Sequence, residues 1–342
     1  MKFVRKSVVV AAAVVLSAGV SLAQAASSLN LGSYKVTGTY ALDIEPSGSV
    51  SGLEASAVTY ARDRGTLFYV GDEGTGVVEV SLTGQTLGSM AFNWTGTDSK
   101  NHDTEGLTYL GNGQLVVTEE RLFDAYSFAY SAGGTANLAA NSVSISNAKV
   151  GNSGLEGISY DARNGGFVAV QEGNSDVTKP QPQDVLAGKL TFSAGTVGTT
   201  GTSTMANLFN PASLGVSSLS DVQTLSSVDS FAGTAAADHL LVLSLGSRTL
   251  LEVNRAGQVI SSLDLSGVLA NNGIEGVTVD EKGTIYLVAE QWQKNVPAGM
   301  TNPQSQLIVL TAPVPEPETF AMLLAGLGVL GAVARRRKQK RG

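Results

Sequence analysis

Short apolar runs separated by turns follow one another along most of the chain. The run 67–70 follows a turn at 61–65, and the run 285–288 follows a turn at 280–283. Runs of this length, rich in Val, Ile, Leu, Tyr and Phe and bounded by Gly, Asp or Asn, are typical of β-strands joined as hairpins. A helical solenoid would show a 3.6-residue apolar period, and no long segment between the two ends of the chain does. The pattern therefore predicts an all-β protein.

The hairpins recur, and each begins with a similar seven-residue motif. The five motifs occupy residues 54–60, 103–109, 154–160, 221–227 and 273–279. Their third residues are separated by steps of 49, 51, 67 and 52 residues. Four strands in about 50 residues, repeated at a steady period, predict a β-propeller of four-stranded blades. Five motifs predict five blades, and six blades are the alternative if the long step holds a degenerate one.

The two ends of the repeat array complement each other. The last blade runs out of sequence after 306–311, its expected third strand, whereas the run 34–42 precedes the first motif and has no repeat of its own. We expect this N-terminal run to supply the missing outer strand and close the ring. The Gly-, Ser- and Thr-rich segment 177–218 holds no clear motif, and we interpret it as an insertion or long loop within a propeller spanning 26–313.

Acidic residues recur at the start of the motifs. The first strand of each blade lines the central channel, and alternate strand residues point the same way, so the first and third motif residues should share that direction. The acidic ones are Glu105, Glu156 and Glu275 at the third position, and Glu54, Asp103 and Asp221 at the first. Converging carboxylate oxygens suit Ca²⁺, so the pattern predicts a calcium site in or near the channel, with the three third-position glutamates as core ligands.

A purely structural explanation of the same positions stays open. The glycine that follows each of these glutamates would allow close approach of a neighbouring strand, and the glutamate would bond to a backbone N–H of the next blade. The other two motifs carry Ser56 and Gln223 at the third position. Without a cation or water between them, like charges this close would raise one another's pKa.

A second acidic set ends the second strand of the hairpins. It comprises Asp72, Glu73, Glu119, Glu120, Glu172 and Glu290. The fourth hairpin departs from this pattern, with Leu245-Gly246 at the equivalent place. We expect these residues at one rim of the ring, near Arg121, where they either bind a ligand or are simply solvated.

The composition of the chain excludes some classes of binding partner and of chemistry. The part of the chain between its two terminal signals carries 13 basic and 27 acidic residues, a net charge of −14, against −7 for the whole chain. An acidic body of this kind argues against nucleic acid as a partner. The chain has no cysteine, so neither disulfides nor thiol chemistry are available. No Gly-x-Ser-x-Gly elbow, phosphate-binding loop or His-Glu-x-x-His motif appears.

The N-terminus has the character of an export signal. Lys2, Arg5 and Lys6 precede an apolar run at 8–20, and Ala23-Gln24-Ala25 is a small-x-small cleavage site. Residues 1–25 are therefore predicted to be a signal peptide, so the mature chain begins at Ala26. Both termini are set aside from the interpretation of the fold.

The C-terminal segment 314–342 has three parts. Pro315, Glu316 and Pro317 precede an apolar stretch at 320–334 of about 15 residues and a basic end at 335–341. The stretch is short, because a stable transmembrane helix needs about 20 residues, and the basic end is expected to stay cytoplasmic.

This tail resembles the PEP-CTERM sorting signal of exported Gram-negative proteins. The resemblance implies a precursor held in the inner membrane by its tail and recognised by an exosortase, which cleaves near the Pro-Glu-Pro. The product would then reach the cell surface or the extracellular space. An ordinary C-terminal transmembrane anchor is the alternative.

The body resembles the SdiA-regulated, or YjiK-like, β-propeller proteins. The resemblance rests on the 54–60 motif with Asp72-Glu73 and on Thr104-Glu105-Gly106 with Glu119-Glu120-Arg121. It continues in order through the segments 221–244, 250–259 and 273–290. It covers roughly 30–312, apart from the segment 177–218. It implies an envelope-associated propeller compatible with calcium binding, although Leu245-Gly246 breaks the symmetry of the rim. The esterase-like phytases share such blades, which keeps an enzymatic alternative.

Three functions are compatible with these observations, and a purely structural surface protein is the third of them. The first is an exported, non-enzymatic propeller that binds a ligand or partner, such as an extracellular polysaccharide or a surface protein, with Ca²⁺ in or near its channel. The second is a metal-dependent phosphoesterase, in which clustered carboxylates hold metals that polarise a phosphoryl group and activate water. The second needs a cationic phosphate clamp, and the scattered basic residues argue against it.

Overall fold

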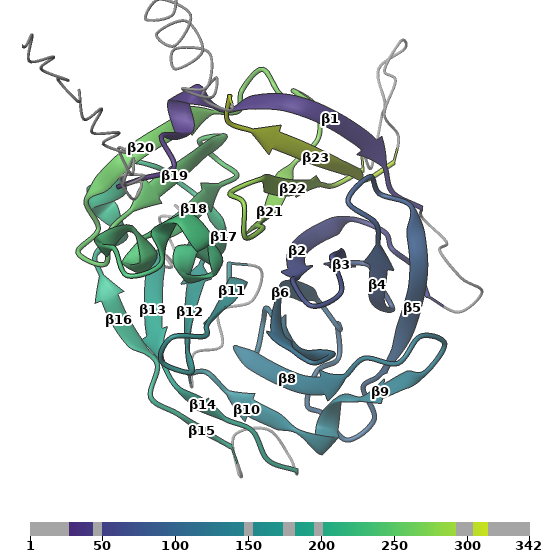
Figure 1. The fold of residues 1–342 in the computed structure, drawn as a ribbon. Helices are drawn as coiled ribbons and strands as arrows, with labels where there is room; N and C mark the ends of the chain where they lie inside the picture. The colour runs from purple at the N-terminus through teal and green to yellow at the C-terminus, as the bar shows by residue number, and fades with distance from the viewer. Residues whose placement is uncertain are drawn as a thin grey trace, which may run out of the picture.

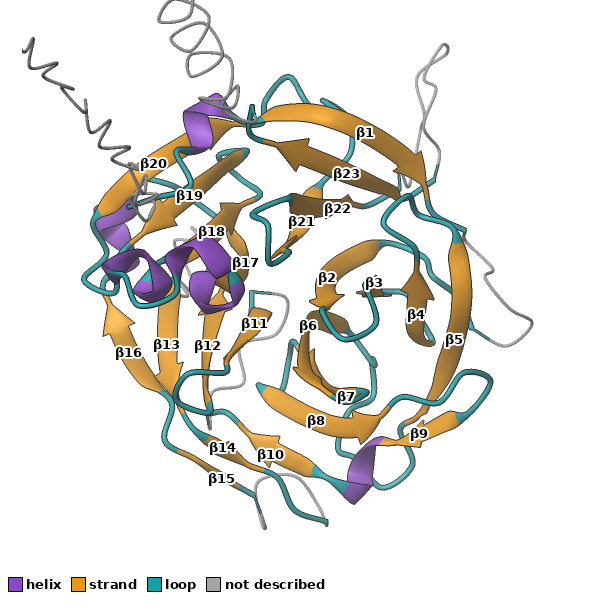
Figure 2. Cartoon of the chain, viewed as in Figure 1, coloured by secondary structure: helices purple, strands orange, loops and turns teal. Residues whose placement is uncertain are grey.

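The predicted hairpins are arranged as five antiparallel blades around a common axis (Figure 1). The computed structural model describes residues 27–43, 50–146, 153–173, 182–194, 201–291 and 304–313. Every helix in these ranges is a short 3₁₀ turn, and three of them, η4 (Leu225–Ser227), η5 (Asp229–Phe231) and η6 (Ala235–Asp238), join two strands of blade four (Figure 2). The prediction of an all-β propeller with five blades is confirmed.

Each blade begins with an inner strand near the axis and continues outward through hairpins. Blade one contains β2 (Ala55–Ala61), β3 (Thr66–Gly71), β4 (Gly76–Val80) and β5 (Thr86–Asn93). Blade two contains β6 (Thr104–Gly111), β7 (Gln114–Glu119), β8 (Asp124–Ala129) and β10 (Ser142–Ser144). The short β9 (Thr135–Asn137) leaves blade two, passes into η2 (Leu138–Ala140), and pairs in parallel with β5. This strand ties the first two blades together at their outer edge.

The remaining blades follow the same plan. Blade three contains β11 (Leu155–Asp161), β12 (Gly166–Gln171), β13 (Asp184–Gly188) and β16 (Ala206–Phe209). Blade four contains β17 (Leu219–Thr224), β18 (Leu240–Ser244), β19 (Thr249–Val253) and β20 (Val259–Asp264). Blade five contains β21 (Ile274–Val279), β22 (Ile285–Ala289), β23 (Gln306–Thr311) and the N-terminal β1 (Lys35–Ala41).

The N-terminal strand closes the ring, as the sequence predicts. β1 pairs antiparallel with β23, from Lys35 opposite Thr311 to Ala41 opposite Gln306. Just before β1, the turn η1 (Leu31–Ser33) is fastened to blade four, because Leu31 N–H donates to Ser261 Oγ at 3.1 Å. Residues 31–41 therefore link blades four and five.

The segment 177–218 is part of the propeller core, which corrects its interpretation as an insertion or long loop. Its described part supplies the third and fourth strands of blade three, β13 and β16. Between them, the ribbon of β14 (Leu190–Thr191) and β15 (Thr202–Ser203) runs beside the outer strand of blade two, where Ser142 and Ser193 exchange backbone hydrogen bonds. η3 (Pro211–Leu214) then leads into blade four. Within the described part of this segment, the ribbon of β14 and β15 is the addition to the blade, and it covers an otherwise open strand edge.

Five apolar clusters hold the blades together, one in each space between neighbours. Phe68 of blade one and Tyr126 of blade two, both fully buried, meet in one of these clusters. Burying apolar surface on both faces of each sheet explains why the strands read as nearly continuous apolar runs. The core is therefore a ring of interfaces.

A circle of side-chain hydrogen bonds links the inner strands at the sixth motif position. The side-chain oxygens of Thr59, Thr108 and Ser159 accept the backbone N–H groups of Tyr109, Tyr160 and Thr224 in the following blade at 3.0, 2.9 and 3.0 Å. Thr278 Oγ1 accepts the N–H of Tyr60 at 3.1 Å and donates to Gln223 Oε1 at 3.1 Å, which completes the circle. Every blade is thus bonded to the next near the axis.

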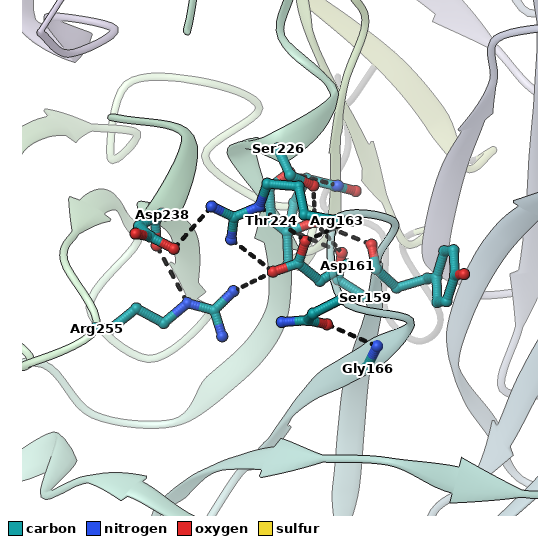
Figure 3. Close-up of polar contacts among 11 residues, drawn as sticks. Ser159, Asp161, Arg163, Gly166, Thr224, Ser226, Asp238 and Arg255 are labelled. Atoms are coloured by element: carbon teal, nitrogen blue, oxygen red, sulfur yellow. Dashed lines mark hydrogen bonds and ion pairs between the residues drawn. The ribbon is translucent and has the colours of Figure 1, made fainter. Parts of the chain in front are cut away.

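Charged groups reinforce the contact between blades three and four at this end of the ring (Figure 3). The buried carboxylate of Asp161 accepts from Arg163 Nη2 at 2.7 Å and from Arg255 Nη2 at 2.6 Å. Arg163 also pairs with Asp238 at 2.7 Å. The guanidinium groups hold the pKa of Asp161 below its usual range, against the effect of burial. These ions join β11 to the β19–β20 turn.

Candidate acidic site at the channel mouth

Each inner strand begins with a β-bulge. In blades one, two, three and five, the bulged residue is the third residue of the predicted motif. The pairing of inner and second strands shifts by one residue at Ser56, Glu105, Glu156, Ser220 and Glu275. A bulge takes one residue out of the hydrogen-bond ladder and redirects its side chain. Three glutamates from different blades therefore leave the ladder at the same level of the ring.

These three glutamates act on one another electrostatically. Burial raises the pKa of Glu156 well above its ordinary value, and the charges of Glu105 and Glu275 raise it further. Burial, then the charge of Glu290, then that of Glu105 raise the pKa of Glu275. Burial raises the pKa of Glu105 as well. The three side chains thus lie at the same end of the ring, and the bulges, not a regular alternation of the strand, direct them there.

Several of the acids that end the second strands lie at the same end, because those strands pair antiparallel with the start of the inner strands. Burial, followed by the charge of Asp103, raises the pKa of Asp72 to about 6. Burial raises the pKa of Glu120 to about 7, and that of Glu290 also rises. We term the whole set the acidic mouth: Asp72, Glu105, Glu120, Glu156, Glu172, Glu275 and Glu290.

Other predicted residues have partners outside this set. Arg121 Nε donates to Asp103 Oδ2, so the predicted rim arginine is engaged by a predicted channel carboxylate. Glu119 is buried and accepts from Ser99 Oγ and from the backbone N–H of Leu122, both at 2.8 Å. Its carboxylate shapes the turn after β7. Asp103 and Glu119 thus serve local contacts.

Two further acids of blade one, Glu54 and Glu73, are not part of the acidic mouth. Glu54 is half-buried, and its backbone is left-handed with φ of 57°, while Glu73 is exposed. In blade three, Glu172 accepts a hydrogen bond from Ser218 Oγ of the next blade. The acidic mouth is therefore asymmetric, as the missing acid pair at Leu245-Gly246 suggests.

Blade four departs from the predicted register by three residues. Its bulge lies at Ser220, so Asp221 occupies the fourth position and Gln223 the sixth. The prediction of Asp221 at the first position and Gln223 at the third is therefore wrong. The Asp221 carboxylate is buried and accepts the backbone N–H groups of Val277 and Val222, both at 2.7 Å. It fastens blade five to blade four.

Glycine occupies this fourth position in three other blades, and close packing explains why. A Cβ at Gly276 would lie 2.9 Å from Ser56 O and 2.9 Å from Ala57 Cα of blade one. A Cβ at Gly157 would lie 2.6 Å from Asp221 Cα. The structural explanation for the glycine of the Glu-Gly pairs is thus supported. In blade four, the Asp221 side chain lies against the space left by Gly157.

The donor chemistry of the acidic mouth suits a hard cation, but its side chains are not gathered into a ligand shell. Among the residues that the structure describes, no three Asp, Glu or His side chains form a group able to hold a metal ion. Glu275 and Glu290 instead share a hydrogen bond, as a pair holding a proton would. An ion at this mouth would require carboxylates from several blades to rotate together.

The opposite end of the ring holds a cavity of about 630 Å³, which the sequence analysis missed. We term it the hydroxyl mouth, because its wall includes Thr59, Thr108, Gln223 and Thr278. In the corrected register, the sixth position of every motif is a hydroxyl or an amide. The sequence already shows this repetition, since the sixth residue of the other four motifs is Thr59, Thr108, Ser159 or Thr278.

The sorting segments fall outside the described residues. This applies to the predicted signal peptide at 1–25, to Pro315, Glu316 and Pro317, and to the expected transmembrane helix at 320–334. Within the described ranges, no helix is both long and apolar enough to cross a membrane.

Comparison with known proteins identifies both parts of the chain. A family model described as SdiA-regulated matches residues 34–292, and one described as the PEP-CTERM protein-sorting motif matches residues 313–338. A glutaminyl cyclase from Myxococcus xanthus is similar over 82% of this chain and 97% of its own, with 13% identity and a TM-score of 0.47. A luciferin-regenerating enzyme is similar over 80% and 95%, with 9% identity and a TM-score of 0.43. Likenesses this distant carry no conclusion about activity.

Proposed function

Since the chain belongs to the SdiA-regulated family and carries a PEP-CTERM sorting motif, we propose that it is an exported, non-enzymatic β-propeller that binds Ca²⁺ at its acidic mouth. The sorting motif implies export through the cell envelope and processing by an exosortase. The bound ion would give a strongly acidic protein a cationic centre for a ligand or partner outside the cell.

The convergence of Glu105, Glu156 and Glu275 from three blades supports this proposal most directly. Loss of hydration raises the pKa of all three carboxyl groups, and the charge of Glu105 further raises the pKa of both Glu156 and Glu275. Burying like charges without a countercharge is unfavourable, and a hard cation relieves both the repulsion and the lost hydration. Ca²⁺ accepts six to eight oxygen ligands in flexible geometry, which suits carboxylates carried by separate blades.

The same site offers little to a phosphoesterase. Such an enzyme needs cationic groups to bind a phosphoryl oxygen. Arg121 lies next to the acidic mouth, but its guanidinium is engaged by Asp103. We therefore expect no turnover of phosphate esters by the calcium-loaded protein, and turnover that is abolished in Glu105→Gln would instead favour the enzymatic alternative.

Metal analysis and thermal unfolding test the calcium proposal. The closed ring spans Lys35 to Thr311, so residues 26–313 contain the whole propeller. After treatment with EDTA, this protein is titrated with Ca²⁺ at pH 8. Specific binding stabilises the folded state by about 2.7 kcal/mol at 100 times Kd, which raises the unfolding temperature by several degrees.

Paired variants identify the site. The double substitution Glu105→Gln with Glu275→Gln should abolish the calcium-dependent shift, whereas Asp264→Asn, on the exposed outer strand of blade four, should keep it. A protein that retains no calcium and shows no shift in unfolding temperature would refute the calcium site. The exported propeller itself would be unaffected by that result.

A further inference from the structure

The hydroxyl mouth is a built recess, formed at the same level by all five blades. Its wall combines the sixth and seventh motif positions with the turns that follow the inner strands. The polar side chains facing it are Thr59, Thr108, Gln223, Thr224, Ser226, Ser227 and Thr278, with Asn112 from a turn of blade two. A volume of about 630 Å³ falls within the range of small-molecule sites.

Two threonines of the hydrogen-bond circle, Thr59 and Thr108, line this recess. Thr59 and Thr108 each use Oγ1 to accept a backbone N–H from the next blade. Within the circle, these two hydroxyls only accept hydrogen bonds. Each O–H can therefore donate a hydrogen bond to a bound molecule. The hydrogen bonds to the next inner strand hold both hydroxyl oxygens in place.

Two buried polar atoms in the wall have no partner. Ser227 Oγ and Glu281 Oε2 are inaccessible to solvent, and neither forms a hydrogen bond with any described residue. Buried polar atoms are nearly always paired, so unpaired ones beside a recess point to a ligand or to ordered water. Both atoms lie on the side of the recess formed by blades four and five.

The charges around the recess restrict what fits. Arg62 is paired with Asp229 at 2.9 Å, and Asp63 accepts from Asn112 N at 3.1 Å. Burial, followed by a side-chain hydrogen bond with Glu281, raises the pKa of Tyr60, so the Glu281 carboxylate lies beside this tyrosine. An anionic ligand would meet carboxylates, and an apolar one would leave the hydroxyls unpaired at a cost.

We propose that the hydroxyl mouth binds a neutral, polyhydroxylated ligand, the terminal units of an oligosaccharide. Sugar hydroxyls both donate and accept, and they match a wall of hydroxyl, amide and carboxylate groups. The half-buried edges of Tyr60, Tyr109 and Tyr160 supply the apolar part of the wall. This site lies at the opposite end of the ring from the acidic mouth and needs no calcium.

Isothermal titration of residues 26–313 in EDTA tests the proposal. The probes are cellohexaose, maltohexaose and xylohexaose, with hexalysine as a cationic competitor. We expect saturable binding of at least one neutral hexasaccharide. Ser227→Ala and Glu281→Gln should each weaken that binding about tenfold, which corresponds to one hydrogen bond. The matched control Ser262→Ala, on an exposed outer strand, should bind as the unmodified protein does.

Thermal unfolding separates recognition from structure. Because Ser227 Oγ is unpaired in the ligand-free protein, Ser227→Ala should leave the unfolding temperature unchanged or raise it while binding falls. The Glu105→Gln, Glu275→Gln protein should bind the sugar normally. Absence of binding to all three hexasaccharides, binding of hexalysine alone, or unchanged affinity in both wall variants would overturn the proposal.

Discussion

At the scale of single residues, the acidic mouth lowers the stability of the folded state. Glu105 is buried and Glu156 and Glu275 are half-buried, and loss of hydration raises the pKa of each well above its ordinary value. An apolar side chain at a bulge would avoid this repulsion. The glutamates therefore cost stability unless protons or a cation neutralise them, and this balance depends on pH.

The metal-free protein should become less stable as the pH rises from about 4 to about 7. The pKa of Asp72 is raised from 3.8 to about 6, and that of Glu120 from 4.5 to about 7. Between those values the unfolded chain binds fewer protons than the folded one, so stability is full below the unfolded pKa and is lost as the pH rises through the folded pKa. Urea denaturation in EDTA at pH 5 and pH 8 measures this difference.

Glu120→Gln provides the internal comparison for this prediction. The amide keeps the shape of the side chain and cannot ionise, so the variant should lose less stability between pH 5 and pH 8. Added Ca²⁺ should remove most of the decline in the unmodified protein. A stability that rises across the same interval in EDTA would mean that the carboxylates are already compensated by other groups.

The sequence predicted the acidic mouth better than it predicted blade four. Glu105, Glu156 and Glu275 stand in motifs whose next residue is glycine, so their register could be read directly. Blade four carries Asp221 at that glycine position. The sequence alignment placed Asp221 at the first motif position, three residues from its true place. The replacement succeeds because Asp221 binds the Val277 N–H across the blade boundary, a tertiary contact that a local pattern does not reveal.

At the scale of elements, the inner strands carry the sequence repeat and also the contacts between blades. Glycine at the fourth position lets neighbouring inner strands approach closely, and the hydroxyl at the sixth position binds the next blade. The strands predicted from short apolar runs between turns were therefore found where they were expected. Strands β13 and β16 were missed because they lie in a polar segment and are defined mainly by pairing with β12 and with each other.

Removing one hydroxyl from the circle should weaken the whole ring. In Thr108→Val the shape of the side chain is kept, but the N–H of Tyr160 loses its acceptor. A partly buried donor left unpaired costs about 1–3 kcal/mol of unfolding free energy. The control Thr135→Val, at an exposed position of β9, should change it by about 0.5 kcal/mol or less. Urea denaturation of both variants measures the difference. If Thr108→Val is as stable as Thr135→Val, the circle has no structural role.

At the scale of the whole molecule, stability depends on joining the two ends of the propeller. Blade five is made of three strands from the end of the repeat array and one from its beginning. Because a ring has no free blade edge, both mouths keep their shape only while this junction holds. The side-chain positions at the acidic mouth and the hydroxyl mouth are thus linked to a single strand pair, β1 and β23.

A disulfide across that junction should lock the ring. Lys35 and Thr311 are partners in the β1–β23 register, and partners in an antiparallel pair lie at about 4.5–5.5 Å between Cα atoms, within the range for a disulfide. The chain has no cysteine, so Lys35→Cys with Thr311→Cys adds the only thiols. The oxidised variant should be about 2–4 kcal/mol more stable than its reduced form, because the cross-link restricts the unfolded chain. Each single variant should match the unmodified protein under both conditions, whereas a pair that fails to oxidise would show that β1 does not occupy the outer position of blade five.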